Sequence, residues 1–449
     1  MKIAVMGCGY VGLVSGTCLA SLGHKVIGVD VDQKRVDALS RGEIPIYEPG
    51  LSELIRAETA QGRLRFSTDA IAAIRESPTI FIAVGTPPAP SGGADLSMLF
   101  AAAQSVTQAA NGPKTLVIKS TVPPGTGEKI ADSVSDGPHK IEVVNNPEFL
   151  REGTAIQDFM QPDRIIFGAN STDGLDVLRE IYQPLIDRGY TIFSMNRQSA
   201  ELAKFAANAM LAMRISFINE LSQLAHAVGA DIESVRVGIG TDKRIGPAFL
   251  KAGVGYGGSC FPKDVAALVY QMQQIGIEPH LLAGIEKVNS RQKELFAKRI
   301  ADALVGIKDP QVAVWGLAFK PDTDDMRESP SIDVIKALLK NHVHVRAYDP
   351  QAMANARKIL GDAIVWSKSL EECTKGVDAI VLVTDWPEFI TQDWKAIASL
   401  MRGNRIFDGR NCLASGKVSA AGLHYHAIGR QEVAPMQGKP GSMGFVSAG

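Results

Sequence analysis

The sequence predicts two α/β domains with Rossmann-like, doubly wound parallel sheets, joined by a central all-helical segment. In both halves of the chain, short β-rich runs alternate with longer stretches of helical spacing, as in parallel sheets with crossover helices. Between Ser199 and about Ala301 the β-rich runs stop. We therefore expect a first sheet domain at 1–198, a helical segment at 199–301, a second sheet domain at 302–430 and a mobile tail at 431–449.

The strands are predicted from short runs rich in β-branched and aromatic residues that are bounded by turn residues. In the first domain they are expected at Lys2–Met6, Lys25–Asp30, Thr79–Val84, Thr115–Ser120 and Ile141–Asn145. In the second domain they are expected at Gln311–Leu317, His344–Tyr348, Ala379–Thr384 and Arg405–Phe407. The tail is predicted from prolines and glycines without periodicity.

The central segment contains one long predicted helix, Glu201–Val228, which carries apolar residues on more than one face. A helix that is apolar on several sides needs several neighbours. We expect these neighbours to be the two flanking domains and a second copy of the chain, so that the segment is both a linker and a homodimer interface.

The composition is that of a globular protein large enough for two or three domains. The 449 residues are 45% hydrophobic and 21% charged. With 47 Lys and Arg against 48 Asp and Glu, the net charge of −1 provides no field that would attract nucleic acid or an anionic membrane. No apolar stretch reaches the roughly 18 residues that a membrane span needs. We expect a soluble protein with neither kind of partner.

The cysteines are few and scattered, which excludes a disulfide framework and a C-x-x-C metal site. They are Cys8, Cys18, Cys260, Cys373 and Cys412. We expect a reducing, cytoplasmic location and no metal.

A dinucleotide fingerprint follows the first strand directly: Gly7, Gly9 and Gly12 form G-x-G-x-x-G at the start of a predicted helix. Gly7 permits the tight turn, Gly9 lets the backbone approach a pyrophosphate, and Gly12 allows close packing of helix on strand. Asp30 ends the next strand, where its carboxylate can accept the ribose hydroxyls and repel the 2'-phosphate of NADP. This favours NAD over NADP, while FAD stays open because flavoproteins share the fingerprint. Arg35 is either an adenosine contact or a solvated helix charge.

A second group of residues indicates covalent chemistry. Lys204 and Asn208 are four residues apart and share a helix face, although a snorkelling lysine beside a surface amide would look the same. The segment from Gly253 to Asp264 is too rich in glycine for a regular element and has Cys260 at its tip. Lys263 could lower the pKa of this thiol and Asp264 could position a water, as a nucleophilic cysteine requires. The alternative is a buried, inert cysteine.

Six motifs together resemble those of the UDP-glucose/GDP-mannose dehydrogenase family, and the resemblance spans nearly the whole chain. They are Gly7–Gly12, Lys119–Thr126, Asn146–Gly153, Lys204 with Asn208, Gly257–Asp264, and Gly316–Pro321 with Arg327–Ser329.

This resemblance implies oxidation of the C6 alcohol of a nucleotide sugar to a carboxylate with two NAD in turn, through a thiohemiacetal and a thioester on Cys260. Lys204 and Asn208 then steady the developing oxyanion. Asp264 and Thr121 hold the catalytic water, and Glu148 transfers a proton. The sequence motif around Cys260 favours UDP-glucose as the substrate, with GDP-mannose or UDP-N-acetylmannosamine as alternatives.

The resemblance also implies the binding residues. Those for NAD are Gly7, Gly9, Tyr10, Val11, Gly12, Asp30, Arg35, Thr86, Thr121, Glu152, Lys263 and Arg327. Those for the substrate are Glu148, Phe149, Leu150, Arg151, Glu152, Lys204, Asn208, Arg244, Phe249, Leu250, Lys251, Ala252, Gly253, Gly257 and Lys320. Arg244 would come from the neighbouring subunit, so that the dimer completes the site. A diphosphate needs cationic partners, and we expect Arg244, Lys251 and Lys263 to provide them.

The second sheet domain lacks the dinucleotide fingerprint after its first strand, so we expect it to bind the nucleotide part of the substrate instead. Two other functions compete with this one. A two-electron β-hydroxy-acid dehydrogenase would need a lysine and an amide, but neither a nucleophilic thiol nor a second α/β domain. An NAD-responsive binding protein would have no use for Cys260, Lys204, Asn208 and Asp264 together.

Overall fold

The computed structural model describes residues 1–436, which form two compact units. Unit 1 comprises Met1–Met213, Ser259–Glu286 and Asp322–Asp324. Unit 2 comprises Arg214–Gly258, Lys287–Pro321 and the chain from Asp325. No helix among the described residues is both long enough and apolar enough to cross a membrane.

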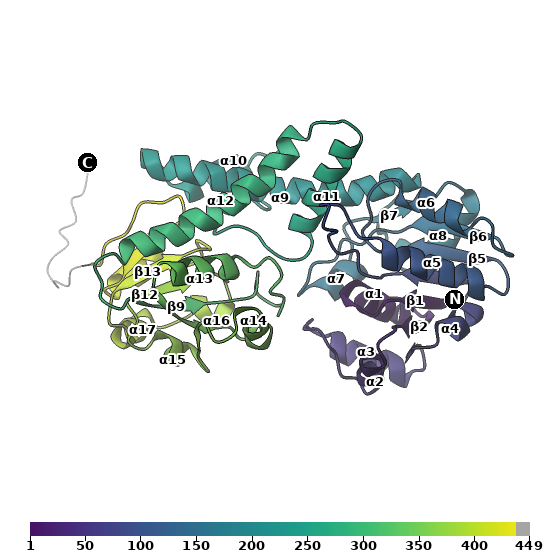
Figure 1. Cartoon of the computed structure of the whole chain (residues 1–449), viewed down its shortest axis with the longest axis horizontal. Coiled ribbons are helices and arrows are strands. Elements are labelled where there is room, and N and C mark those ends of the chain that lie inside the picture. Colours follow the sequence, from purple (N-terminus) through teal and green to yellow (C-terminus); the bar gives the residue numbers. More distant parts are fainter. Residues whose placement is uncertain (437–449) are drawn as a thin grey trace, which may run out of the picture. The chain divides into compact units, whose positions relative to one another are not determined.

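Unit 1 is built on an eight-stranded sheet in the order β3-β2-β1-β4-β5-β6-β7-β8 (Figure 1). The strands are β1 (Lys2–Met6), β2 (Lys25–Val29), β3 (Leu64–Ser67), β4 (Thr79–Ile82), β5 (Lys114–Ile118), β6 (Ile141–Asn145), β7 (Ile165–Gly168) and β8 (Ile192–Met195). All neighbours pair in parallel except β6 and β7, which meet antiparallel at Asn145 and Gly168. The predicted parallel sheet is confirmed, with this one antiparallel junction as an addition.

Helices cover both faces of this sheet. They are α1 (Tyr10–Ser21), α2 (Gln33–Ser40), α3 (Leu51–Ala60), α4 (Ala70–Glu76), α5 (Ser97–Ala109), α6 (Thr126–Val134), α7 (Ala155–Met160) and α8 (Thr172–Ile186). Alternation along β1 accounts for the two layers, because Ile3 and Val5 belong to one buried cluster and Ala4 and Met6 to the other. A sheet that is apolar on both faces must be covered on both, which gives the doubly wound fold.

Unit 2 repeats this topology with six parallel strands in the order β11-β10-β9-β12-β13-β14. The strands are β9 (Gln311–Trp315), β10 (His344–Tyr348), β11 (Val365–Trp366), β12 (Ala379–Leu382), β13 (Arg405–Asp408) and β14 (His424–Ala427). Its helices are α13 (Pro330–Lys340), α14 (Met353–Leu360), α15 (Leu370–Thr374), α16 (Pro387–Ile390), α17 (Trp394–Leu400) and α18 (Ser415–Ala420). When the strands of each sheet are numbered in chain order, the first six strands of the unit 1 sheet and the six strands of the unit 2 sheet both follow the order 3-2-1-4-5-6. This is the strand order of dinucleotide-binding folds.

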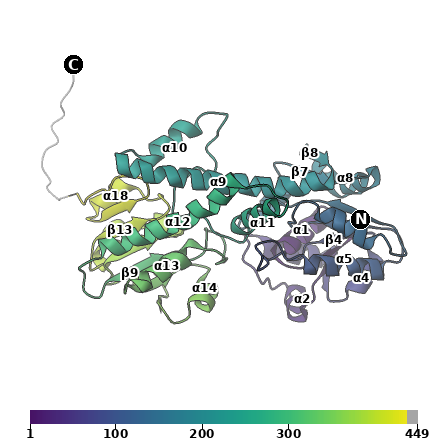
Figure 2. The same cartoon turned by 45° about the horizontal axis from the view of Figure 1, so that its top comes forward.

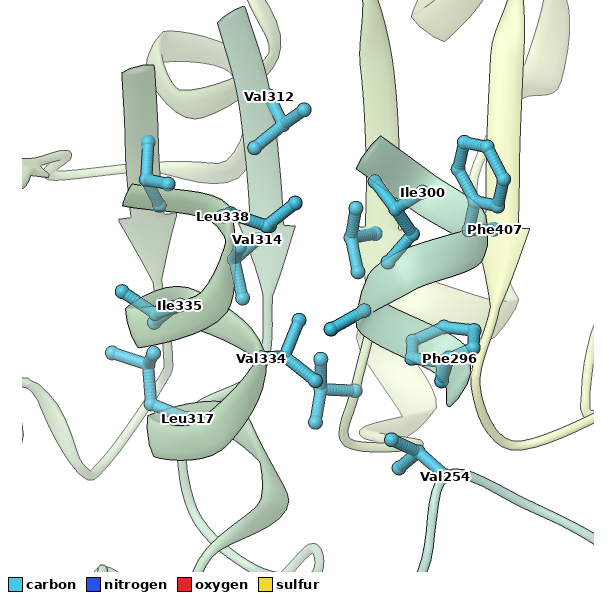
Figure 3. Packing of buried hydrophobic residues seen from close by; sticks show 14 of the residues in the cluster. Val254, Phe296, Ile300, Val312, Val314, Leu317, Val334, Ile335, Leu338 and Phe407 are labelled. Atoms are coloured by element: carbon cyan, nitrogen blue, oxygen red, sulfur yellow. The ribbon is translucent and has the colours of Figure 1, made fainter. Parts of the chain in front are cut away.

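The central segment is helical, as predicted, with α9 (Arg197–Val228), α10 (Ile232–Gly240), α11 (Phe261–Gln274) and α12 (His280–Ala303) (Figure 2). It does not form a compact unit of its own. Its residues divide between unit 1 and unit 2. Figure 3 shows why α12 belongs in part to unit 2, since Phe296 and Ile300 pack in one buried cluster with Val312 and Val314 of β9.

The start of the predicted tail differs from the expectation. Val433 and Tyr425 exchange two backbone hydrogen bonds of 3.0 Å. Ser419 donates its hydroxyl to the carbonyl of Ala434 at 2.6 Å, and the N–H of Met436 returns to Ser419. Residues 431–436 are therefore part of unit 2 rather than of a mobile tail, and the remaining predicted tail lies outside the described residues.

Candidate active site

The glycine-rich turn after β1 has the geometry that a dinucleotide requires. Gly7 has a φ of 96°, and a Cβ there would lie 2.8 Å from the carbonyl oxygen of Ala83. A Cβ on Gly12 would lie 1.9 Å from the carbonyl oxygen of Gly7. At Gly9, by contrast, no atom of the described residues lies within 4 Å of the Cβ position. The turn is closed where strand and helix pack and open where a pyrophosphate would approach, so these residues fit an NAD molecule.

Asp30, at the end of β2, is bound to this turn. Its Oδ2 accepts the backbone N–H of Cys8 at 2.9 Å and an N–H of Arg35 at 3.0 Å, and its Oδ1 accepts the N–H of Asp32 at 3.0 Å. Burial acts to raise the pKa of Asp30, but the hydrogen bonds from Asp32, Cys8 and Arg35 outweigh it and hold the pKa below its usual value. A charged carboxylate therefore stands at the predicted ribose position, and Arg35 is an ion-pair partner of Asp30 rather than a freely solvated charge.

Two more predicted cofactor residues meet at the ends of neighbouring strands. Thr86 follows β4, and its hydroxyl donates to the carbonyl of Thr121, which follows β5, at 2.9 Å. Tyr10 donates its hydroxyl to Glu48, whose carboxylate also accepts the N–H groups of Gly153 and Ala155 at 2.6 and 2.8 Å. Glu48 thus connects the start of α1 with the loop that carries Glu152.

The predicted proton-transfer residue and the predicted oxyanion donor form a buried ion pair. Lys204 Nζ of α9 lies 3.1 Å from Glu148 Oε1, and both side chains are 5% exposed. The N–H of Leu150 donates to Glu148 Oε2 at 2.6 Å. Burial opposes both charges, but the attraction between them lowers the pKa of Glu148 and raises that of Lys204. Glu148 is therefore an ionised carboxylate.

Asn208, one turn after Lys204 on α9, forms a hydrogen bond with another predicted catalytic residue, Asp264. Asn208 donates through Nδ2 to Asp264 Oδ2 at 2.6 Å, and Lys263 donates to Asp264 Oδ1 at 2.5 Å. Asp264 is 1% exposed. The lysine and the amide that the sequence places on one helix face thus contact two separate carboxylates, Glu148 and Asp264.

Cys260 is the N-cap residue of α11 and is solvent-exposed. The pKa of its thiol is raised, first by desolvation by the surrounding protein and then by the charge of Glu148, while Lys204 acts to lower it. The expected effect of Lys263 on this pKa stays a prediction, and Lys263 is paired with Asp264. A cation that favours the thiolate is Lys204.

In unit 2, the predicted substrate segment Phe249–Gly253 and Gly257 belong to an irregular loop held by side chains. Asn219 of α9 accepts the N–H of Gly253 at 2.8 Å, and Gln292 of α12 donates to the Gly253 carbonyl at 2.9 Å. A Cβ on Gly257 would lie 2.2 Å from the Glu328 carbonyl oxygen. The glycines are needed because other parts of the protein backbone and side chains approach closely.

Within this segment Leu250 and Ala252 are buried, whereas Lys251 is exposed and lies 3.8 Å from Asp385. Arg244 is paired with Asp242 at 2.6 Å, with an 89% exposed side chain. The three cations expected to meet a diphosphate, Arg244, Lys251 and Lys263, thus each face a carboxylate.

The remaining predicted residues divide between the units. In unit 1, two cations lie near the Phe149 ring, with Arg164 at 3.7 Å and Lys204 at 5.2 Å from its centroid. Arg151 pairs with Asp158. In unit 2, Arg327 pairs with Asp325 at 2.6 Å and Lys320 Nζ lies 5.5 Å from the Phe319 ring centroid.

Comparison with known proteins identifies the family. Residues 1–186 match the NAD binding domain of the UDP-glucose/GDP-mannose dehydrogenase family, residues 198–291 its central domain and residues 313–415 its UDP binding domain. The chain belongs to this family.

Individual relatives agree over nearly the whole length. The chain is 42% identical to the UDP-glucose 6-dehydrogenase TuaD of Bacillus subtilis (strain 168) over 435 residues, 96% of this chain and 94% of the relative. It is 43% identical to the UDP-glucose 6-dehydrogenase of Rhizobium meliloti (strain 1021), covering 96% of this chain and all of the relative. Among solved structures, a UDP-glucose dehydrogenase from the hyperthermophilic archaeon Pyrobaculum islandicum superposes with a TM-score of 0.89 at 38% identity, covering 96% of this chain and 98% of that one.

The UDP binding domain of this family member has a turn after β9 that differs from the dinucleotide turn after β1. Gly316 keeps a φ of 90°, but Asp349 at the end of β10 has both oxygens occupied. Its Oδ2 accepts from Leu317, Ala318 and the Trp386 indole, and its Oδ1 accepts two backbone N–H groups. Asp349 is 1% exposed and is thus used within the fold, and the absence of a second dinucleotide stays a prediction.

Sequence reasoning missed several buried residues that position this family's motifs. Glu201 accepts the N–H groups of Gly125 and Gly127 at 2.7 and 2.6 Å and so holds the loop after Thr121. Lys119 donates to Asn146 at 2.9 Å, and burial lowers its pKa to about 7. Glu48 was missed in the same way. Lys119 and Asn146 stand in two of the family motifs, but the contact between them joins residues distant in sequence. No spacing pattern could predict this contact or those of Glu48 and Glu201.

Proposed function

We propose that the chain is a UDP-glucose 6-dehydrogenase that oxidises the C6 alcohol of UDP-glucose to the carboxylate of UDP-glucuronate. The observation that carries the proposal is the grouping around Cys260: an exposed thiol at the start of α11, under the influence of Lys204, Glu148 and Asp264. A simple alcohol dehydrogenase needs no nucleophile, whereas oxidation to the acid needs one to retain the intermediate aldehyde.

The turn Gly7–Gly12, Asp30 and the Thr86–Thr121 pair would hold NAD. NAD, when bound, accepts a hydride in each of the two oxidations. The chain's own contribution begins with Glu148, which takes the hydroxyl proton as the alcohol becomes an aldehyde. The support is the lowered pKa of this carboxylate, which keeps it ionised beside Lys204. Lys204 neutralises the oxygen on which negative charge develops.

Cys260 would then add to the aldehyde as a thiolate to give a thiohemiacetal. The second oxidation converts this adduct into a thioester, and attack of water releases the carboxylate and the free thiol. We assign the orientation of that water to Asp264, which accepts from Asn208 and Lys263, and to Thr121, whose backbone carbonyl accepts from Thr86. Lys204 favours the thiolate by its charge, against the raised pKa of the thiol.

The UDP part would be bound by unit 2, whose sheet domain matches the family's UDP binding domain. We assign this role to the loop Phe249–Gly253 with Gly257 and Lys320. For recognition of the sugar we propose residues 148–152, Lys204 and Asn208.

We further propose a homodimer joined through the central helices, with Arg244 serving the site of the partner copy. The support is an apolar surface in unit 2: Phe217 and Leu224, seven residues apart on α9, are 49% and 59% exposed, and Val237 of α10 is 52% exposed. The 89% exposed Arg244 side chain is available to reach a neighbour. A cytoplasmic location, expected from the scattered cysteines, belongs to the same proposal.

The substrate is tested with the purified chain, NAD and each of UDP-glucose, GDP-mannose and UDP-N-acetylmannosamine, with NADH absorbance as the readout. We expect kcat/KM to be highest for UDP-glucose. Higher efficiency with either of the other two sugars would replace UDP-glucose in the proposal and leave the chemistry of the thiol intact. No NADH with any of them would refute the dehydrogenase proposal itself.

A further inference from the structure

A small hairpin at the edge of the unit 2 sheet gathers two histidines and a glutamate. His424 and His426 lie two residues apart on β14, so they share one face of this edge strand. The chain then reverses, and Val433 pairs antiparallel with Tyr425. This register places Glu432 directly opposite His426 and diagonal to His424, on the same face.

The three side chains are within reach of one ion. Glu432 Oε1 lies 2.9 Å from His426 Nδ1, and its Oε2 lies 3.7 Å from His424 Nε2. One ligand atom from each residue can be chosen so that all three lie within 4.8 Å of one another. Tetrahedral zinc ligands at about 2.1 Å from the metal are about 3.4 Å apart. Because the His424 and Glu432 side chains are 31% and 43% exposed, small rotations can close the difference.

The buried member of the group, His426, is held in place by packing. His426 is 5% exposed, its ring stacks on Phe407 at 4.5 Å between centroids, and its Nε2 has no hydrogen-bond partner among the described residues. Its Nδ1, which lies 2.9 Å from Glu432 Oε1, is the ring nitrogen directed into the group. Packing of the ring on Phe407 fixes the direction of this nitrogen.

Arg299 completes the surroundings of Glu432. Its Nη2 lies 3.2 Å from Glu432 Oε1, and its Nη1 donates to the Ala427 carbonyl at 2.6 Å. Ligating carboxylates are commonly oriented by such a second partner. Because the guanidinium contacts Oε1, Oε2 is left towards His424 as the ligand atom. The positive charge also weakens attraction for a cation, which makes this a site of moderate affinity.

We propose that His424, His426 and Glu432 form a binding site for a divalent transition-metal ion of the zinc type. Two imidazoles and one carboxylate are a ligand set that zinc uses with a water in the fourth position. The site would stabilise the hairpin that closes the unit 2 sheet, and the reaction proposed above does not depend on it.

The test uses the full chain with Cys260→Ala as the parent, because an exposed thiol would itself bind zinc. The metal-stripped parent is titrated with Zn²⁺ by calorimetry and with Co²⁺ by visible spectroscopy. We expect one equivalent of Zn²⁺, the absorption of tetrahedral Co²⁺, and a higher unfolding temperature with metal. His424→Gln and Glu432→Gln should each weaken binding by about tenfold or more, the scale expected for loss of groups around a metal.

The matched controls are His342→Gln and Glu371→Gln, which change exposed residues of the same types elsewhere in unit 2. They should bind Zn²⁺ as the parent does. The proposal is overturned if the parent binds no stoichiometric metal, or if both ligand variants bind it as tightly as the controls. His424 and Glu432 are tested rather than the buried His426, since their substitution leaves the packing on Phe407 in place.

Discussion

At the scale of single residues, the candidate active site consists of charges that set each other's state. Glu148 and Lys204 keep each other charged. One oxygen of Asp264 accepts a hydrogen bond from Asn208 and the other accepts one from Lys263. Such pairs are costly to bury and strongly destabilising to break one-sidedly. Their arrangement beside a thiol is what distinguishes this site from an ordinary hydrophobic domain core.

Asp30 provides a test of cofactor choice at this scale. Asp30→Ala should lower kcat/KM for NAD by about tenfold or more, which is the effect of losing a charge-assisted hydrogen bond. It should also reduce the ratio of kcat/KM for NAD to kcat/KM for NADP. Arg35, released from its ion pair with Asp30, would be available to a 2'-phosphate. The double variant Asp30→Ala/Arg35→Ala is the control and should lose the gain with NADP. Equal efficiency of the unmodified chain with both cofactors would contradict this account.

Lys119 gives a prediction about pH. Its pKa is about 7 in the folded chain and about 10.4 in an unfolded one, so the unfolded state binds more protons between these values. Stability contributed through Lys119 therefore rises with pH from about 7 to about 10. Lys119→Met should flatten the increase in urea midpoint over this window, whereas Lys368→Met, at an exposed position, should keep it. If the urea midpoint of the Lys119 variant rose with pH as steeply as that of the unmodified chain, the pKa of Lys119 would not be lowered in the folded state.

At the scale of elements, loops are positioned by buried side chains from other parts of the same unit. Arg410 is one example, since its guanidinium donates to the carbonyls of Val383, Gly255 and Phe319 at 2.6, 3.2 and 2.7 Å. It thereby connects the carboxyl edge of the second sheet with the predicted substrate loop.

Glu48 offers the test at this scale. In Glu48→Gln the amide would direct a donor at the N–H of Gly153 or Ala155, leaving a buried group unpaired at a cost of about 1–3 kcal/mol. We expect weaker NAD binding, read by calorimetry, together with a lower unfolding temperature. Tyr10→Phe, which removes only the phenol hydroxyl, should have a smaller effect on both. If Glu48→Gln bound NAD normally and were equally stable, this carboxylate would not position the loop.

Particular elements show how far the sequence could predict the fold. Strands β1, β6 and β10 have the predicted bounds, because their apolar runs are clearly delimited. Strands β3, β7, β8, β11 and β14 were missed. β11 has two residues, β3 and β8 are partly exposed, and β14 is His-Tyr-His-Ala, so these four show no continuous buried apolar run. β7, Ile-Ile-Phe-Gly, is fully buried and was overlooked.

Some residues of the candidate active site could be predicted from the sequence and others could not. Cys260, Lys204, Asn208 and Asp264 carry recognisable spacing and are close enough in the structure to influence each other. The contacts of Glu48, Lys119 and Glu201 could not be predicted, because a buried charge is explained only by partners that folding brings to it. Their side chains contact residues 27 to 107 positions away in the chain.

At the scale of the whole molecule, the predicted dimer is tested on the apolar surface of α9. Phe217→Asp and Leu224→Asp should each convert the dimer to a monomer in sedimentation, because a buried unpaired charge opposes association. Ile359→Asp, on α14 with 47% exposure, is the control and should remain dimeric.

Mixing Arg244→Ala with Cys260→Ser subunits should restore some activity if sites are shared. An unmodified chain that sediments as an active monomer would contradict the dimer.

The central claim is that one site carries an alcohol to an acid through a covalent bond to Cys260. The most direct measurement is the number of NADH formed per UDP-glucose when the sugar is limiting and NAD is in excess. We expect two NADH and one UDP-glucuronate per sugar. We also expect that Cys260→Ser binds both ligands but nearly stops turning over, because a serine hydroxyl has a far higher pKa than a thiol. A yield of one NADH with release of the aldehyde, or two NADH at the normal rate from Cys260→Ser, would contradict the claim.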